Sequence, residues 1–112
     1  GVAPGGESQP GAEPVPVRFV LLTGKHFNEQ MEPATFVALS QRQAVLEARS
    51  PVPVYSNLLL RLEAVPGEAE APELYAKVIR PFDESGNRHL IHFTSVPPDV
   101  RARLNRLVEQ ST

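Results

Sequence analysis

From residue 34 the chain reads Ala34-Thr-Phe-Val-Ala-Leu-Ser-Gln-Arg-Gln-Ala-Val-Leu-Glu-Ala48, which is two alternating apolar runs separated by the polar cluster Ser40-Gln-Arg-Gln43. Alternation with a period of two is typical of β-strands, and a short polar segment between two such runs is typical of a turn. The sequence therefore predicts a β-hairpin with strands at 34–39 and 43–48 and a turn at Ser40 to Arg42.

The same period of two continues on both sides of this hairpin. Val17, Phe19 and Leu21 alternate in a first strand, and a polar connecting loop follows over residues 23–33. Pro51 and Pro53 then interrupt the ladder, because proline lacks a backbone N–H donor. Further strands are expected at 56–63, 73–80 and 89–95, the last two joined by a turn at 85–87. Leu58, Leu60 and Leu62 share one strand face, which we expect to face the core.

The end of the chain changes to helical spacing. Pro98 and Asp99 suit the first turn of a helix, since proline is tolerated there and an acidic group is favoured at that end. A helix is therefore predicted over 98–110. Its apolar face consists of Val100, Leu104, Leu107 and Val108, and Arg101, Arg103 and Arg106 are expected to face away. Six antiparallel strands and one terminal helix predict an all-β fold, a small closed barrel without exposed sheet edges.

Composition limits the domain organisation and the class of partner. The 112 residues suffice for one domain. Residues 1–14 are rich in Pro, Gly, Glu, Ser and Ala, which predicts a flexible linker, and the folded domain is expected at 15–112. Eleven basic and thirteen acidic side chains give no electrostatic argument for a nucleic-acid or membrane-surface partner. Cysteine is absent, and no apolar run is long enough to span a membrane as a helix. A soluble, cytoplasmic protein is expected.

Three segments point to a family. The ending Leu90-Ile-His-Phe-Thr-Ser-Val-Pro-Pro-Asp-Val-Arg-Ala-Arg-Leu-Asn-Arg-Leu-Val108 resembles the end of a PilZ domain, in which a last strand runs into a helix. Phe36-Val-Ala-Leu-Ser and Leu74-Tyr-Ala-Lys-Val-Ile are similar to the C-terminal PilZ-like domain of some bacterial class III adenylate or guanylate cyclases. The resemblance covers most of residues 15–110. It implies a six-stranded antiparallel PilZ-like β-barrel with a C-terminal α-helix.

The resemblance also implies a function. It suggests a non-catalytic regulatory or interaction module of a bacterial signalling protein, appended to a nucleotide cyclase. Such a module would dock on the upstream domain of the same polypeptide, on a protein partner or on a second copy of itself. For a homodimer, the candidate contact patch is formed by the outer apolar positions Val20, Leu22, Leu59 and Ile79. The alternative is a sensor domain that binds cyclic di-GMP or another cyclic nucleotide at a non-standard site.

The PilZ ligand motifs are only partly present. Their second motif is [D/N]xSxxG, and the matching frame here reads Ala38-x-Ser40-x-x-Gln43, so only the serine is kept. The RxxxR motif before the first strand is missing, and Arg18 lies inside that strand. We therefore expect no tight binding of cyclic di-GMP. A residual ligand site would use Ser40, Arg42 and Gln43, joined by Arg18 if its side chain emerges at the same barrel mouth. Otherwise Ser40 and Arg42 serve only the turn.

Metal and catalytic sites are not indicated. His26, His89 and His92 are the only histidines, and a spacing of three places His89 and His92 on opposite faces of a strand. They are interpreted as surface or barrel-rim histidines and not as metal ligands. No motif typical of a nucleophilic or phosphate-binding enzyme occurs. The sequence therefore predicts a domain that is not an enzyme and needs no cofactor.

Overall fold

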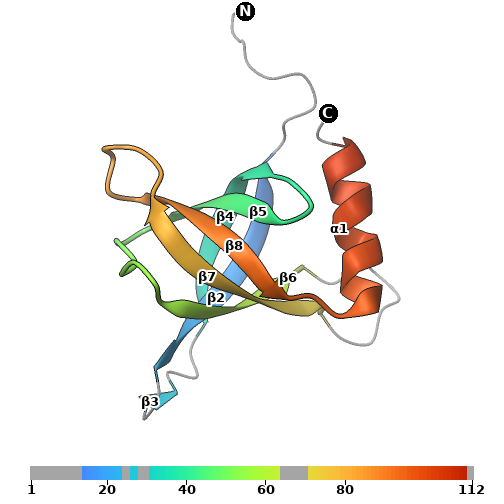
Figure 1. The fold of residues 1–112 in the computed structure, drawn as a ribbon, viewed down its shortest axis with the longest axis horizontal. Coiled ribbons are helices and arrows are strands. Elements are labelled where there is room, and N and C mark those ends of the chain that lie inside the picture. Colours follow the sequence, from blue (N-terminus) through green and yellow to red (C-terminus); the bar gives the residue numbers. More distant parts are fainter. Residues whose placement is uncertain (1–13, 24–25, 28–30, 64–70, 111–112) are drawn as a thin grey trace, which may run out of the picture.

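Six antiparallel strands close on themselves around one apolar core in the computed structural model, which describes residues 14–23, 26–27, 31–63 and 71–110 (Figure 1). The elements are, in chain order, β2 (Val15–Thr23), β3 (His26–Phe27), β4 (Glu32–Leu39), β5 (Gln43–Ala48), β6 (Asn57–Leu62), β7 (Glu73–Pro81), β8 (Arg88–Ser95) and α1 (Pro98–Gln110). The predicted six-stranded antiparallel barrel with one C-terminal helix is confirmed.

The strand order is that of a Greek key. Around the barrel the strands follow as β2-β4-β5-β8-β7-β6, and β6 pairs with β2 to close the ring. β2, β4 and β5 are neighbours in sequence and in space, whereas β6 returns to lie beside β2. The closing ladder runs from the pair Val17 and Leu62 to the pair Leu22 and Asn57. The short strand β3 pairs only with the end of β2.

Alternating burial produces the barrel interior. In β6 the three leucines Leu58, Leu60 and Leu62 are at most 1% exposed, as their spacing predicts, and in β8 the inward positions include Ile91 and Phe93. The rings of Phe36 and Phe93 pack at a centroid distance of 6.0 Å and a tilt of 57°, which is a favourable aromatic geometry. One continuous apolar cluster joins all six barrel strands to the helix.

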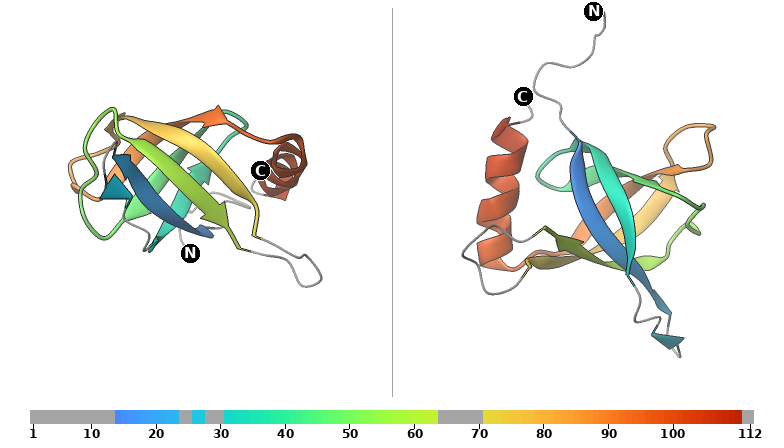
Figure 2. Two further views of the ribbon diagram at one scale, coloured as in Figure 1. Left: turned by 90° about the horizontal axis from the view of Figure 1, so that it is seen from below. Right: turned by 180° about the vertical axis from the view of Figure 1, so that it is seen from behind.

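The helix covers one end of the barrel. Its residues Val100 and Leu104 are buried in the barrel cluster, as predicted from the helical spacing. Arg101 donates a hydrogen bond to the carbonyl oxygen of Gln41, and Arg103 donates one to the carbonyl of Glu63 at 2.7 Å. The expectation that Arg101 and Arg103 face away was wrong, because the β4–β5 turn and the residue after β6 offer carbonyl oxygens beside the apolar face of the helix. Both views of Figure 2 place the helix and the β7–β8 turn at opposite ends of the barrel.

The start of β4 differs from the sequence prediction. β4 begins at Glu32, and Pro33 is paired opposite Arg18, although residues 23–33 were expected to form a loop. Proline is compatible with the first residues of a strand, where a missing N–H removes little of the ladder.

Residues 1–13, nearly all of the predicted linker, lie outside the described residues. Within the part of the chain that the structure describes, α1 is too short and too polar to cross a membrane.

Candidate functional site

The β4–β5 turn uses the hydroxyl group of Ser40 for its own closure. The Ser40 N–H donates to the carbonyl of Gln43 at 2.8 Å, and the Gln43 N–H donates to Ser40 Oγ at 3.1 Å. Ser40 Oγ also lies 3.2 Å from the same carbonyl and donates to it. A hydroxyl group has one proton to donate. Ser40 therefore acts as the turn residue that sequence reasoning gave as the alternative to a ligand contact.

The backbone of this turn is held by its neighbours, whereas its side chains are exposed. The carbonyl of Gln41 accepts from Arg101 of the helix, and the carbonyl of Arg42 accepts from the N–H of Phe93 at 2.9 Å. The side chains of Arg42 and Gln43 lie in solvent. The guanidinium group of Arg42 has no hydrogen bond or ion pair with any described residue. The backbone of the turn is thus held by hydrogen bonds from the helix and from β8, and the guanidinium of Arg42 is the turn's one cationic group open to a partner.

Arg18 lies far from this turn. It is exposed on the outer face of β2, opposite Pro33 on β4 and Arg61 on β6. Pro33 and Ser40 are separated by nearly the whole length of β4, which at about 3.3 Å per residue is roughly 23 Å. The structure therefore brings Ser40, Arg42 and Gln43 together but does not bring Arg18 to them. The condition under which Arg18 would join that site is not met.

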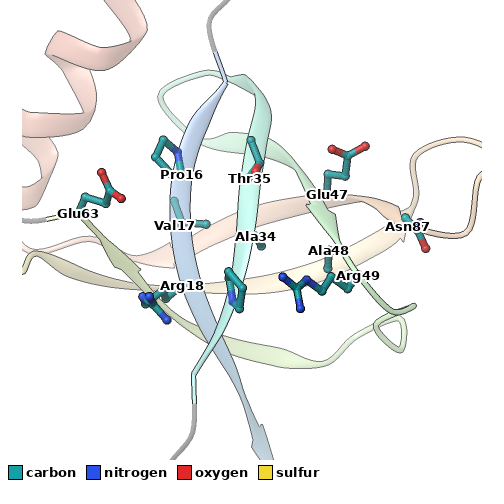
Figure 3. A pocket seen from close by; sticks show the side chains of 11 residues that line it. Pro16, Val17, Arg18, Ala34, Thr35, Glu47, Ala48, Arg49, Glu63 and Asn87 are labelled. Atoms are coloured by element: carbon teal, nitrogen blue, oxygen red, sulfur yellow. The ribbon is translucent and has the colours of Figure 1, made fainter.

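Arg18 instead lines an open groove on the outside of the barrel, here called the outer groove. Its volume is about 480 Å³, within the range of small-ligand sites. The charged side chains along it are Arg18, Glu47, Arg49 and Glu63. Figure 3 shows the two arginines on one side of the groove and the two glutamates on the other. The complete lining is Pro16, Val17, Arg18, Pro33, Ala34, Thr35, Glu47, Ala48, Arg49, Glu63 and Asn87.

An ion-pair network stabilises the β7–β8 turn next to this groove. Arg88 Nε lies 3.0 Å from Glu47 Oε2, and Arg88 Nη1 lies 3.5 Å from Asp83 Oδ2. The bond to Glu47 is the main reason that the pKa of Arg88 is raised above its usual value. Hydrogen bonds from the side chain and backbone of Ser85 lower the pKa of Asp83. Gly86 follows with φ of 84°, as expected for this turn.

His89 is buried, which contradicts its interpretation as a surface or rim histidine. It is 3% exposed, and its Nε2 accepts a hydrogen bond from the N–H of Val52 at 3.3 Å. Burial lowers the pKa of His89 below its usual value, and a hydrogen bond with the backbone of Ser50 opposes this shift. The side chain thus joins β8 to the segment between β5 and β6. His92 is exposed, so the prediction of opposite faces for the two histidines is confirmed.

The end of the barrel opposite the helix exposes large apolar side chains. Val54 is 41%, Tyr55 is 70% and Phe82 is 44% exposed. These three residues are called the Tyr55 surface below. Tyr55 has a φ of 70°, and it occupies the third position of a turn closed by the Ser56 N–H and the Pro53 carbonyl. Glycine is the residue expected there, since other side chains are strained at positive φ.

Register places the three members of the Tyr55 surface at one end of the barrel. The Tyr55 N–H donates to the carbonyl of Val78 on β7 at 2.7 Å. Phe82 comes directly after the end of that strand, four residues beyond Val78, so the backbones of both aromatic residues lie towards the β7–β8 turn. Sequence reasoning missed this surface. Its only signals were apolar residues within segments otherwise read as turns, and the backbone angle of Tyr55 cannot be read from sequence.

The outer apolar patch proposed from sequence is largely covered. Val20 is only 7% exposed, although it lies outside the barrel cluster, and Leu22, Leu59 and Ile79 are half-buried. Val20 lies directly opposite Leu59 on β6, so neighbouring outer side chains cover one another. These four residues therefore offer less free apolar area than the Tyr55 surface.

Residues suited to metal binding do not gather in the described part of the chain, where no three His, Asp or Glu side chains form a possible metal site. His26 lies in β3, but its side chain is outside the described residues. Comparison with known protein-family models and with curated protein sequences gave no match. Function therefore has to be inferred from the surface of this barrel and from the residues on it.

Proposed function

We propose that this domain is a non-catalytic interaction module of a bacterial signalling protein, and that it docks on protein through the Tyr55 surface. The observation on which the proposal rests is Tyr55 itself. The residue is 70% exposed although its backbone is in a conformation that costs a tyrosine roughly 1–2 kcal/mol. Strained residues of this kind are concentrated at binding and switch sites. Exposed tyrosine and phenylalanine are also typical anchors of protein interfaces.

The resemblance to PilZ-like domains supports the signalling context. It favours a cytoplasmic module attached to an adenylate or guanylate cyclase, with the upstream domain of the same polypeptide as its docking partner. The helix covers one barrel end, so the opposite end, where Tyr55 and Phe82 lie, is the end available for docking. No cofactor, metal or nucleic acid is part of this proposal.

The alternative, a cyclic di-GMP sensor, has less support from the arrangement of residues. A cyclic dinucleotide requires cationic groups and stacking surfaces that converge. Ser40 is used by its turn, and Arg18 lies about 23 Å along the barrel from it. Calorimetric titration of the protein with cyclic di-GMP should give no saturable heat at micromolar ligand. Saturable binding that Arg42→Ala abolishes would favour the sensor over the interaction module.

Site-specific photo-cross-linking tests the docking surface directly. A benzophenone amino acid is placed at position 55 or, as a control, at the exposed position Thr94 on β8, in the natural full-length polypeptide in its host. We expect position 55 to give an adduct that maps to one peptide, on the same polypeptide or on a defined partner, and that excess unmodified domain competes away. Equal adducts from both positions, or none from position 55, would contradict the proposal.

A further inference from the structure

Charged residues form two parallel rows on the outer face of the barrel, across β6, β2, β4 and β5. In the first row Arg61 is paired opposite Arg18 and Arg18 opposite Pro33. Arg49 follows Ala48, the partner of Ala34, and so continues this row beyond Pro33. The first row, called the basic row, therefore runs Arg61, Arg18, Pro33, Arg49.

The second row has the opposite charge. Pro16 is paired opposite Thr35, and Thr35 opposite Glu47. Glu63 follows Leu62, the partner of Val17, and therefore lies beside Pro16. This acidic row runs Glu63, Pro16, Thr35, Glu47. On each strand, the member of the acidic row lies two residues away from the member of the basic row. Figure 3 shows the two glutamates on one side of the groove and Arg18 and Arg49 on the other. The two rows together are called the two-row face.

Several charges of the two-row face have no partner within the described part of this chain. The guanidinium groups of Arg18 and Arg49 and the carboxylate of Glu63 make no hydrogen bond or ion pair with any described residue. Other arginines do: Arg61 pairs with Glu73 at 2.6 Å, and Arg88 pairs with Glu47 at 3.0 Å. The face therefore offers both signs of charge to a partner.

The chemistry of the face limits the kind of partner. None of the residues lining the outer groove is aromatic, so it offers no ring on which a nucleobase could stack. Its acidic row would also repel a polyanion. A partner that fits must bring acidic groups to one row and basic groups to the other, with the same spacing between them. Among the described residues of this chain, the surface with that pattern is the two-row face itself.

Symmetry decides whether two such faces can meet. A two-fold axis that lies in the interface and runs along the rows places the basic row of one copy on the acidic row of the other. An axis along the strands would place like charges together. We propose that the two-row face is the contact between two copies of this chain, in which Arg49 faces the partner copy's Glu47, while Arg61 and the neighbouring Arg18 lie over the partner copy's Glu63 and Pro16. This is an isologous contact, since the same patch serves both copies.

The centre of this contact is uncharged. Pro16 and Pro33 are exposed, and Thr35 lies between the charged ends of the rows. Rigid proline rings lose little conformational freedom on binding, which favours association. The charges lie at the rim, where ion pairs in water are weak and sensitive to salt. The dimer is therefore transient, with electrostatics setting its orientation. The proposal is independent of docking through the Tyr55 surface.

Sedimentation equilibrium of the purified chain measures this association. Protein at about 1 µM to 1 mM covers the dissociation constants of weak, transient complexes. We expect reversible dimerisation at low ionic strength, weakened by added salt, because screening shortens the range of rim charges to about 10 Å at 0.1 M. A reversed basic row, Arg18→Glu with Arg49→Glu, should weaken dimerisation at least about tenfold, since like charges then face each other.

Mixing two variants makes the test specific. The second variant reverses the acidic row, Glu47→Arg with Glu63→Arg. Neither variant should dimerise alone, whereas an equal mixture should associate about as tightly as the unmodified chain, because opposite rows meet again. In the control mixture, the acidic-row variant is combined with Arg80→Glu, Arg106→Glu. This control variant has the same net charge as the basic-row variant, but its two substitutions lie outside the two-row face. Circular dichroism confirms that each variant folds.

The outcomes separate the proposal from general charge attraction. Association of the basic-row variant with the acidic-row variant, without association of the control with the acidic-row variant, supports a dimer through this face. A chain that stays monomeric up to about 1 mM at low salt would overturn the proposal. Dimerisation that is unchanged in the basic-row variant would overturn it equally, since it would place the contact elsewhere on the molecule.

Discussion

The contribution of the helix to stability can be tested with Leu104→Ala. Leu104 is fully buried and belongs to the cluster that joins the helix to the barrel. Alanine removes three buried carbon atoms, which at about 0.8 kcal/mol each is roughly 2.4 kcal/mol of transfer free energy. The cavity left behind adds to this, so we expect a total loss of about 3 kcal/mol in the free energy of unfolding.

Urea unfolding followed by far-ultraviolet circular dichroism measures this loss. With an m value of about 1.5 kcal/mol/M, about 3 kcal/mol lowers the midpoint by roughly 2 M. Leu107→Ala, at a half-buried position, should cost less, and Arg106→Ala, at an exposed one, should change stability by less than about 0.5 kcal/mol. A loss below about 1 kcal/mol for Leu104→Ala, or equal losses at positions 104 and 106, would refute the packing of the helix over the barrel end.

Three further predictions concern single side chains. Because the pKa of His89 is lowered in the folded state, the unfolded chain binds more protons on acidification, so stability should fall as the pH drops below about 6.5, by at most about 1.4 kcal/mol per pH unit. Urea titrations at several pH values should show that His89→Gln reduces this slope and that His92→Gln, at an exposed position, does not. Asn105 Oδ1 is buried without a hydrogen-bond partner among the described residues, so Asn105→Ala should raise stability by about 1 kcal/mol. A lower thermal midpoint for this variant would contradict that account. Tyr55→Gly should leave stability unchanged or raise it by up to about 1 kcal/mol, because relief of left-handed strain equals or exceeds the entropy cost of glycine. The same change should strongly reduce photo-cross-linking from position 82, and undiminished cross-linking there would argue against a role for the ring.

The elements that the sequence predicts well are those with strong local patterns. The hairpin 34–48 and the leucines of β6 follow from alternation, and the helix at 98–110 follows from its prolines, Asp99 and apolar spacing. The burial of His89 could also have been predicted, because His89 alternates on the same face of β8 as Ile91 and Phe93. It was missed because a histidine was assigned to the surface by residue type and not by its position in the alternation.

The surfaces could not be read from sequence in the same way. Arg18 and Arg49 come together only because β4 lies between β2 and β5, a consequence of strand order and register. Arg101 was assigned to solvent because helical spacing gives the direction of a side chain but not the carbonyl groups near it. The turn role that sequence reasoning offered as one of two alternatives for Ser40 is confirmed, since its hydroxyl group bonds to the backbone of Gln43. Serine in a short polar turn commonly bonds to nearby backbone in this way.

The ladder between β2 and β6 has a consequence for how the chain reaches its fold. Hairpins such as β4–β5 and β7–β8 join neighbouring segments, but Val17 must find Leu62 across the three intervening strands β3, β4 and β5. Pairings between distant segments slow folding, and all-β domains rich in them fold in milliseconds to seconds. Until β6 has been synthesised and has docked, one edge of β2 presents unpaired N–H and C=O groups to other chains. During synthesis and refolding, we therefore expect β2 to be the strand edge most exposed to pairing with other chains.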